Sequence, residues 1–258
     1  MRIVVLAGGL SPERDVSLSS GSLIANTLID NGHDVLLIDL YLGVKSDENQ
    51  LLFLNEQSKK RFHYQVPTTE PDLEKLKKES GNGENLIGKG VIEICKSADI
   101  VFISLHGSIG ENGQLQAIFD SFGIRYTGTG YIGSLLAMDK DISKTLMRAN
   151  HIKTPNWKLY DFQENNDFSG VSYPCVVKPC SCGSSVGITI VENPTELNEA
   201  INYAKRYENT ILIEEKIIGR EFSVGILDGV ALPQEAEVLG ISFNDLCEKI
   251  SRSAAYII

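Results

Sequence analysis

Short apolar runs alternate with amphipathic and polar segments over the first half of the chain. The runs Ile3 to Ala7, Asp34 to Ile38 and Ile100 to Leu105 have the length of buried strands, and the segment between the first two has a helical period that ends at Asn31-Gly32. A strand, a helix and a second strand in this order are typical of a βαβ unit with parallel strands. Residues 43–90 are polar and predict a surface excursion with one or two short helices.

After the glycine-rich turn TGTGYIGS the pattern becomes that of a strand-rich lobe. Helices are predicted from Asp139 to Asn150 and from about Pro194 to Tyr207. Three short strands precede the second helix and one follows it, in the segments NWKLY, PCVVKP, ITIV and TILIEE. Residues 221–233 predict a hairpin that turns at Asp228-Gly229, and the last element is an amphipathic helix from roughly Phe243 to Tyr256.

Composition fits a folded protein with more than one core. The 258 residues (28.3 kDa) are 42% hydrophobic and 22% charged, which are ordinary globular values. The net charge is -10 and the chain has no dense Lys/Arg block, which argues against nucleic acid as a partner. No apolar stretch approaches the ~20 residues needed to cross a bilayer, so no membrane partner is expected.

The five cysteines are odd in number and lack the spacing of a disulfide framework. This usage favours a reducing compartment, so we expect a cytoplasmic protein. Cys180 and Cys182 flank a single serine, but the second pair that a zinc site of this type needs is missing. We interpret them as free thiols in a loop.

Two glycine-bearing turns follow the first and third predicted strands. Gly8-Gly9 and the serine-rich segment after it would place N–H groups, hydroxyls and Glu13 at the carboxyl edge of the sheet, where open α/β folds bind ligands. His106-Gly107 reaches the same edge from the third strand. Each turn has a structural alternative. The first would be a tight turn with Ser17 as the helix cap, and in the second His106 would only support the end of the strand.

Two further stretches lie in the strand-rich lobe. Lys178 ends an apolar strand and is followed by CSCGSSVGI, whose backbone N–H groups and hydroxyls can form a concave nest for phosphate. Glu214 and Glu215 end another apolar strand, and Glu221 follows closely. Acceptors at a strand exit suit an adenine amino group and ribose hydroxyls. The structural alternative for each acid is a solvated loop charge.

Taken in order, these stretches resemble the D-alanine:D-alanine ligase family of the ATP-grasp superfamily. The resemblance is carried by GGLSPERDVSLSSG, HGSIGENGQLQAIFDSFGIRYTGTG, SLLAMDKDISK, VVKPCSCGSSVGI and ILIEEKIIGREFSVGIL. It implies an α/β and α+β architecture in three parts. These are an N-terminal doubly wound parallel-sheet domain for substrate at 1–135, an antiparallel ATP-grasp lid at 136–216, and a truncated C-terminal ATP-grasp domain at 217–258 that ends in a family-like last helix.

The resemblance also implies a role for each candidate site residue. Glu13 would hold the ammonium group of the first D-alanine and accept a hydrogen bond from Ser184, while His106 and Val16 would lie beside this substrate. The ATP phosphates would be contacted by Lys140, Lys178 and Ser185. The adenosine pocket would be formed by Glu214, Glu215, Ile217 and Glu221.

The family reaction, as the resemblance implies, uses ATP and Mg²⁺ to convert one D-alanine to an acyl phosphate, which the amino group of a second D-alanine attacks. The dipeptide product serves peptidoglycan synthesis. A cytoplasmic homodimer is expected. The alternatives are a D-alanine:D-serine or D-alanine:D-lactate ligase, and a truncated nucleotide-binding remnant without catalysis.

The chain departs from the family pattern after Pro233. The family's tyrosine-bearing loop, its Gly-Arg-Ile-Asp-type strand and its Glu-x-Asn segment have no counterpart here, and residues 234–258 resemble only the last helix. Phosphoryl transfer depends strongly on the metal that those acids hold. We therefore expect no metal ligands in this chain, weak nucleotide binding, marginal stability or association, and no dipeptide.

Overall fold

The structure, a computed structural model, describes residues 1–44, 60–162, 167–183, 185–220, 225–227, 230–232 and 241–255. It divides into two compact units, one formed by residues 1–130 with 222–258 and the other by residues 131–221. The division into three domains with boundaries at 135 and 216 stays a prediction.

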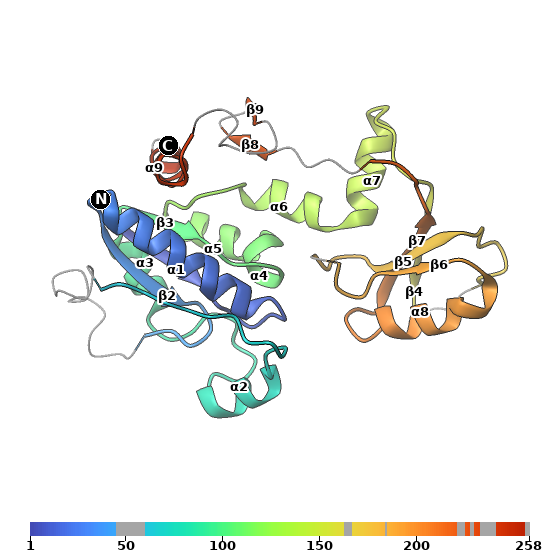
Figure 1. The fold of residues 1–258 in the computed structure, drawn as a ribbon, viewed down its shortest axis with the longest axis horizontal. Coiled ribbons are helices and arrows are strands. Elements are labelled where there is room, and N and C mark those ends of the chain that lie inside the picture. The colour runs from blue at the N-terminus through green and yellow to red at the C-terminus, as the bar shows by residue number, and fades with distance from the viewer. Residues whose placement is uncertain are drawn as a thin grey trace. The chain divides into compact units, whose positions relative to one another are not determined.

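The first unit is built on a parallel sheet with the strand order β2-β1-β3 (Figure 1). Its strands are β1 (Arg2–Ala7), β2 (Asp34–Asp39) and β3 (Ile100–Ile103), and α1 (Arg14–Asp30) connects the first two. Val4 lies opposite Leu36 on one side and opposite Val101 on the other. The βαβ prediction is therefore confirmed.

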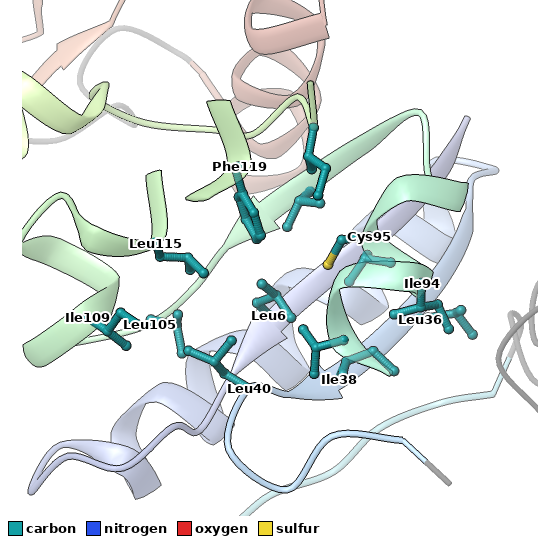
Figure 2. Packing of buried hydrophobic residues seen from close by; sticks show 14 residues of the cluster. Leu6, Leu36, Ile38, Leu40, Ile94, Cys95, Leu105, Ile109, Leu115 and Phe119 are labelled. Carbon is teal, nitrogen blue, oxygen red and sulfur yellow. The ribbon is translucent and has the colours of Figure 1, made fainter. Parts of the chain in front are cut away.

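Apolar side chains of β1 alternate between two buried clusters on opposite faces of the parallel sheet. Val4 and Leu6 belong to the cluster that contains Ile94 of α3 (Val91–Ser97) and Phe119 of α5 (Gln114–Phe122) (Figure 2). Ile3 and Val5 belong to the other cluster, with residues of α1. The sheet is thus covered on both faces, as near-continuous apolar parallel strands require.

The polar excursion between β2 and β3 carries the short helix α2 (Leu73–Ser80), as expected, and residues 45–59 lie outside the described part. Helix α3 was not predicted. With seven residues it makes only two turns, which is too short for a helical period to be recognised. A third short helix, α4 (Ser108–Glu111), follows β3.

The second unit is built on an antiparallel sheet with the order β4-β7-β5-β6. Two helices, α6 (Tyr131–Met138) and α7 (Lys140–Ala149), precede it, and α8 (Leu197–Ala204) follows a 3₁₀ turn at Pro194–Glu196 and packs against β5 and β6. The bounds of all four strands were predicted to within two residues, whereas helix α6 was not predicted at all. They are β4 (Trp157–Asp161), β5 (Cys175–Pro179), β6 (Thr189–Val191) and β7 (Thr210–Glu215).

The end of the chain belongs to the first unit. Strands β8 (Gly225–Leu227) and β9 (Val230–Leu232) pair antiparallel, which confirms the hairpin, while the predicted turn Asp228-Gly229 lies outside the described residues. Helix α9 (Phe243–Ala255) packs against α1 and β3. Cys247 enters the cluster that contains Ile3, and Glu248 accepts a hydrogen bond at 2.7 Å from the His33 ring.

Candidate functional site

The carboxyl edge of the parallel sheet is held together by Ser17. Its hydroxyl accepts the Gly8 N–H at 2.9 Å and donates to the Ser104 carbonyl at 2.7 Å, so it joins the ends of β1 and β3. The interpretation of Ser17 as the helix cap is wrong. The cap position of α1 is Glu13, and Ser17 lies inside the helix, one turn later and fully buried.

A buried ion pair fixes the turn after β1. The Arg14 guanidinium forms a salt bridge with Asp39 at the end of β2 and donates to the Gly9 carbonyl at 2.8 Å. Asp39 also accepts the N–H groups of Tyr41 and Leu42 at 2.9 and 3.0 Å. Because a buried charge needs both a counter-ion and hydrogen bonds, this network determines the path of the residues that precede Glu13.

The Glu13 carboxylate is half-buried and has no hydrogen-bond donor among the residues that the structure describes. Its backbone N–H donates to Ser11 Oγ at 3.2 Å, which holds the residue in place. A Cβ atom at Gly107 would lie 2.5 Å from Glu13 Oε2, so the carboxylate packs directly on the glycine that follows His106. Such a carboxylate is an acceptor available to an ammonium group.

The structure brings His106 to the same edge. Its Nε2 lies 3.2 Å from Ser20 Oγ, and its carbonyl accepts the Ser11 hydroxyl at 3.0 Å. Ser11 therefore contacts both Glu13 and His106. Val16, the other residue expected beside the substrate, is 49% exposed and lines a cavity of about 410 Å³ together with Ser20.

In the second unit, Lys140 points toward the loop that was predicted to bind phosphate. Its ammonium group donates to the carbonyls of Cys180 and Cys182 at 3.1 and 2.6 Å. Burial, together with the positive charge of Lys178, lowers the pKa of Lys140 from its ordinary value. A cation that is partly desolvated in this way is suited to pair with an incoming anion.

The predicted phosphate loop has two residues in the left-handed region, although the N–H groups of Val186 and Ile188 donate to carbonyls within the loop. Ser185 has a φ of +61° and Gly187 a φ of +71°, both in the left-handed region. A strained non-glycine residue at Ser185 is typical of a functional turn, and successive N–H groups around left-handed residues form concave anion sites. Ser184, expected to contact Glu13, lies outside the described residues.

Two of the residues predicted for different parts of ATP form one ion pair. Lys178 bonds to Glu214 Oε1, and both side chains are largely buried. The other carboxylate oxygen, Oε2, meets the ammonium group of Lys144 at 2.8 Å. Lys144 was not singled out from the sequence. Its position one helical turn after Lys140 in SLLAMDKDISK was the available signal, because residues four apart share a helix face.

Glu215 and Ile217 lie near the end of β7 and are exposed. Glu215 accepts the backbone N–H of Asn156 at 3.0 Å, and it lines a cavity of about 280 Å³ that also contacts Glu214 and Trp157. Ile217 is 64% exposed. Glu221, the remaining residue of the predicted adenosine pocket, lies outside the described residues.

No group of three or more His, Cys, Asp or Glu side chains that could hold a metal ion occurs among the described residues. None of the five cysteines forms a disulfide, and burial raises the pKa of the Cys180 thiol to about 11. Across the described ranges, no helix combines the length and apolar character needed to span a membrane.

Comparisons with known proteins bear on both units. A family model described as D-ala D-ala ligase N-terminus matches residues 2–129, and one described as D-ala D-ala ligase C-terminus matches residues 145–256. The D-alanine–D-alanine ligase of Pediococcus pentosaceus is 44% identical over 238 residues, which cover 90% of this chain and 67% of that protein. The chain belongs to the D-alanine–D-alanine ligase family.

A second family member, the D-alanine–D-alanine ligase of Lacticaseibacillus casei, is 40% identical over 235 residues, which cover 90% of this chain and 65% of that protein. The chain therefore spans about two thirds of the length of these relatives. Among solved structures, the Bacillus anthracis ligase complexed with ATP matches with a TM-score of 0.67 at 21% identity, over 98% of this chain and 97% of that one.

The ligase from Coxiella burnetii matches with a TM-score of 0.59 at 25% identity, over 85% of this chain and 65% of that one. These likenesses confirm the predicted fold class, an α/β ATP-grasp fold with a parallel and an antiparallel sheet.

Proposed function

We propose that this protein is an ATP-dependent ligase that joins two D-alanines. Phosphoryl transfer from ATP to the carboxylate of the first D-alanine would give an acyl phosphate and ADP. The amino nitrogen of the second would then attack the acyl carbon, phosphate would leave with the electrons of the C–O bond, and the nitrogen would lose a proton. Membership of the family and the 44% identical D-alanine–D-alanine ligase support this choice of substrate over D-serine or D-lactate.

The observation that carries the proposal is the half-buried Glu13 carboxylate, which lacks a hydrogen-bond donor among the described residues. Lysines and a glycine-rich loop would suit any enzyme that binds ATP, so they do not select the second substrate. An acceptor for an ammonium group selects an amino acid, and the backbone of His106 reaches the same sheet edge through Ser11. We assign Glu13, His106 and Val16 to the first D-alanine.

ATP binding is assigned to the second unit. Lys140, Lys178 and the loop around Ser185 would contact the phosphates and offset the charge that builds up during phosphoryl transfer. Glu214, Glu215 and Ile217 would surround the adenosine. The Bacillus anthracis ligase with a similar fold is complexed with ATP, which supports this assignment. In this proposal Glu221 completes the adenosine pocket, and Ser184 keeps the role beside Glu13 that was predicted from the sequence.

Among the described residues, no three or more His, Cys, Asp or Glu side chains are grouped so that they could hold a metal ion, and we name no magnesium ligand. We therefore assign no step to a metal. The departure from the family pattern after Pro233 is the reason to test a second candidate function, a chain that binds nucleotide without catalysis. A cytoplasmic location and a homodimer also remain part of the proposal.

The decisive experiment uses purified protein whose intact mass is 28.3 kDa. ADP release from ATP and formation of D-alanyl-D-alanine are measured with and without D-alanine, alongside calorimetric titration of ATP. ADP release that depends on D-alanine supports the ligase, and ATP binding without release supports the second candidate. A Glu13→Gln variant keeps the shape and removes the charge, so it should bind ATP normally and D-alanine poorly. Absence of ATP binding would contradict both functions.

A further inference from the structure

The Glu214 carboxylate is shared by two lysines. Oε1 accepts a hydrogen bond from Lys178, whereas Oε2 forms an ion pair with Lys144 at 2.8 Å that lacks hydrogen-bond geometry, and the Glu214 side chain is only 9% exposed. A carboxylate this deeply buried is strongly destabilised when it has no cationic partner. Under the proposed function, however, Lys178 must contact the ATP phosphates, which removes it wholly or partly from Glu214.

The two lysines have different surroundings. The Lys144 ammonium group also donates to Thr154 Oγ1 at 2.8 Å and lies 5.1 Å from the centre of the Trp157 ring, and its side chain is 9% exposed. Trp157 is itself fixed by donation to Asp141 at 2.6 Å. Lys178 is 17% exposed and is followed directly along the chain by the loop that contains Ser185.

We propose that Lys144 is a positioning residue that acts as the permanent counter-ion of Glu214, so that Lys178 is free to transfer to the polyphosphate of ATP. The proposal rests on the ATP site assigned above and adds a residue to it. Lys144 cannot follow Lys178, because Thr154 and Trp157 hold its ammonium group at the opposite oxygen of Glu214. Without Lys144, Lys178 becomes the only partner of a buried carboxylate and competes poorly for phosphate.

Charge removal at either end of the pair gives opposite expectations. Inorganic tripolyphosphate is the probe, because it has no adenine and so does not depend on direct contacts between Glu214 and the base. Lys144→Met should weaken its binding by about tenfold, which corresponds to about 1.4 kcal/mol. Glu214→Gln should bind it at least as tightly as the unmodified protein. The double variant should recover the affinity lost in Lys144→Met, and Lys153→Met, at an exposed lysine of the same unit, should change nothing.

A purely structural role for Lys144 predicts the reverse for the double variant, because a second substitution in the cluster would damage binding further. Failure of Glu214→Gln to rescue Lys144→Met therefore overturns the proposal. If Lys144→Met does not fold, weaker tripolyphosphate binding by Glu214→Gln alone overturns it.

Urea unfolding without ligand separates this proposal from the proposed function. Lys144→Met should lower the unfolding midpoint more than Lys178→Met, because Lys144 is the more buried cation and has the additional bond to Thr154. An equal or larger shift for Lys178→Met would contradict the role of Lys144 as the retained counter-ion. An unmodified protein that binds neither ATP nor tripolyphosphate would instead refute the ATP site, and with it the transfer of Lys178.

Discussion

Replacing Gly107 with alanine tests whether the position of the Glu13 carboxylate determines D-alanine binding. Gly107 has φ +66° and ψ -177°, a backbone conformation that is essentially restricted to glycine. The new Cβ would lie 2.5 Å from Glu13 Oε2, and ordinary contact begins at 3.4 Å. The carboxylate must therefore retreat by about 0.9 Å, or the backbone at residue 107 must shift by a similar distance.

The two consequences differ in size and in what they affect. Backbone strain at residue 107 should lower the free energy of unfolding by about 1 to 3 kcal/mol. A hydrogen bond of about 2.9 Å stretched by this displacement passes the limit at which it is still a bond. Losing one bond to a charged group costs about 1.5 to 3 kcal/mol, so D-alanine affinity should fall by about ten- to a hundredfold.

Calorimetric titration with D-alanine measures the loss of affinity. Urea unfolding measures the loss of stability. Gly123→Ala is the control. Gly123 also has a positive φ, +64°, but a Cβ there would meet nothing within 4 Å. That variant should lose stability and keep its D-alanine affinity. If folded Gly107→Ala binds D-alanine as the unmodified protein does, the placement of Glu13 in the ammonium site is refuted.

Three further substitutions test other parts of the structure. Lys178→Ala should weaken ATP binding by about 2 to 4 kcal/mol, because phosphate charge is left without its partner, and calorimetry that shows unchanged affinity would refute the phosphate assignment. Glu248→Gln should lower the unfolding free energy by about 1 kcal/mol at neutral pH. Burial raises the pKa of Glu248, but hydrogen bonds from His33 and Arg252 outweigh burial and place this pKa below its ordinary value of 4.5. The stabilisation by Glu248 is therefore present above pH 4.5 and is lost as the pH falls through the lowered pKa. A difference between the two proteins that persists in acid would contradict the pairing. Phe119→Ala, at a fully buried position, should cost about 3 to 5 kcal/mol in urea unfolding, and a loss below 1 kcal/mol would show that the site collapses around the cavity.

Most strands were predicted well from the sequence because they contain a short apolar run, and β4 (Trp157–Asp161), with Lys158 and a mixed burial pattern, is an exception. The run Ile3 to Ala7 favoured a strand buried on both faces, and the structure covers both faces. Helix α6 was not predicted, because its sequence lacks a helical pattern of apolar and polar residues. Its eight residues are mostly apolar without a helical period, and Ile132 and Leu135 are exposed by 57% and 49%, so burial does not reveal which face packs.

The candidate site could be predicted only where the type and position of a single residue indicate its chemistry. Glu13 follows a glycine-rich strand end and Lys178 ends an apolar strand, and both positions are visible in one sequence. Ion pairs such as Arg14 with Asp39 join residues 25 apart, so nothing in a single sequence connects them. The same limit applies to Lys144, whose partner Glu214 lies on a strand formed 70 residues later in the chain.

The position of α9 depends on the same kind of long-range pairing. Its amphipathic pattern predicted a helix correctly, but the pattern does not say which surface the apolar face covers. Two polar contacts decide this in the structure. His33 bonds to Glu248, and Asn31 donates to the Asn244 carbonyl at 3.1 Å, so the turn between α1 and β2 fixes the register of α9 against the parallel sheet. Burial of Cys247 then follows from that register, because Cys247 lies beside Glu248 and on the apolar face that the contact with α1 covers.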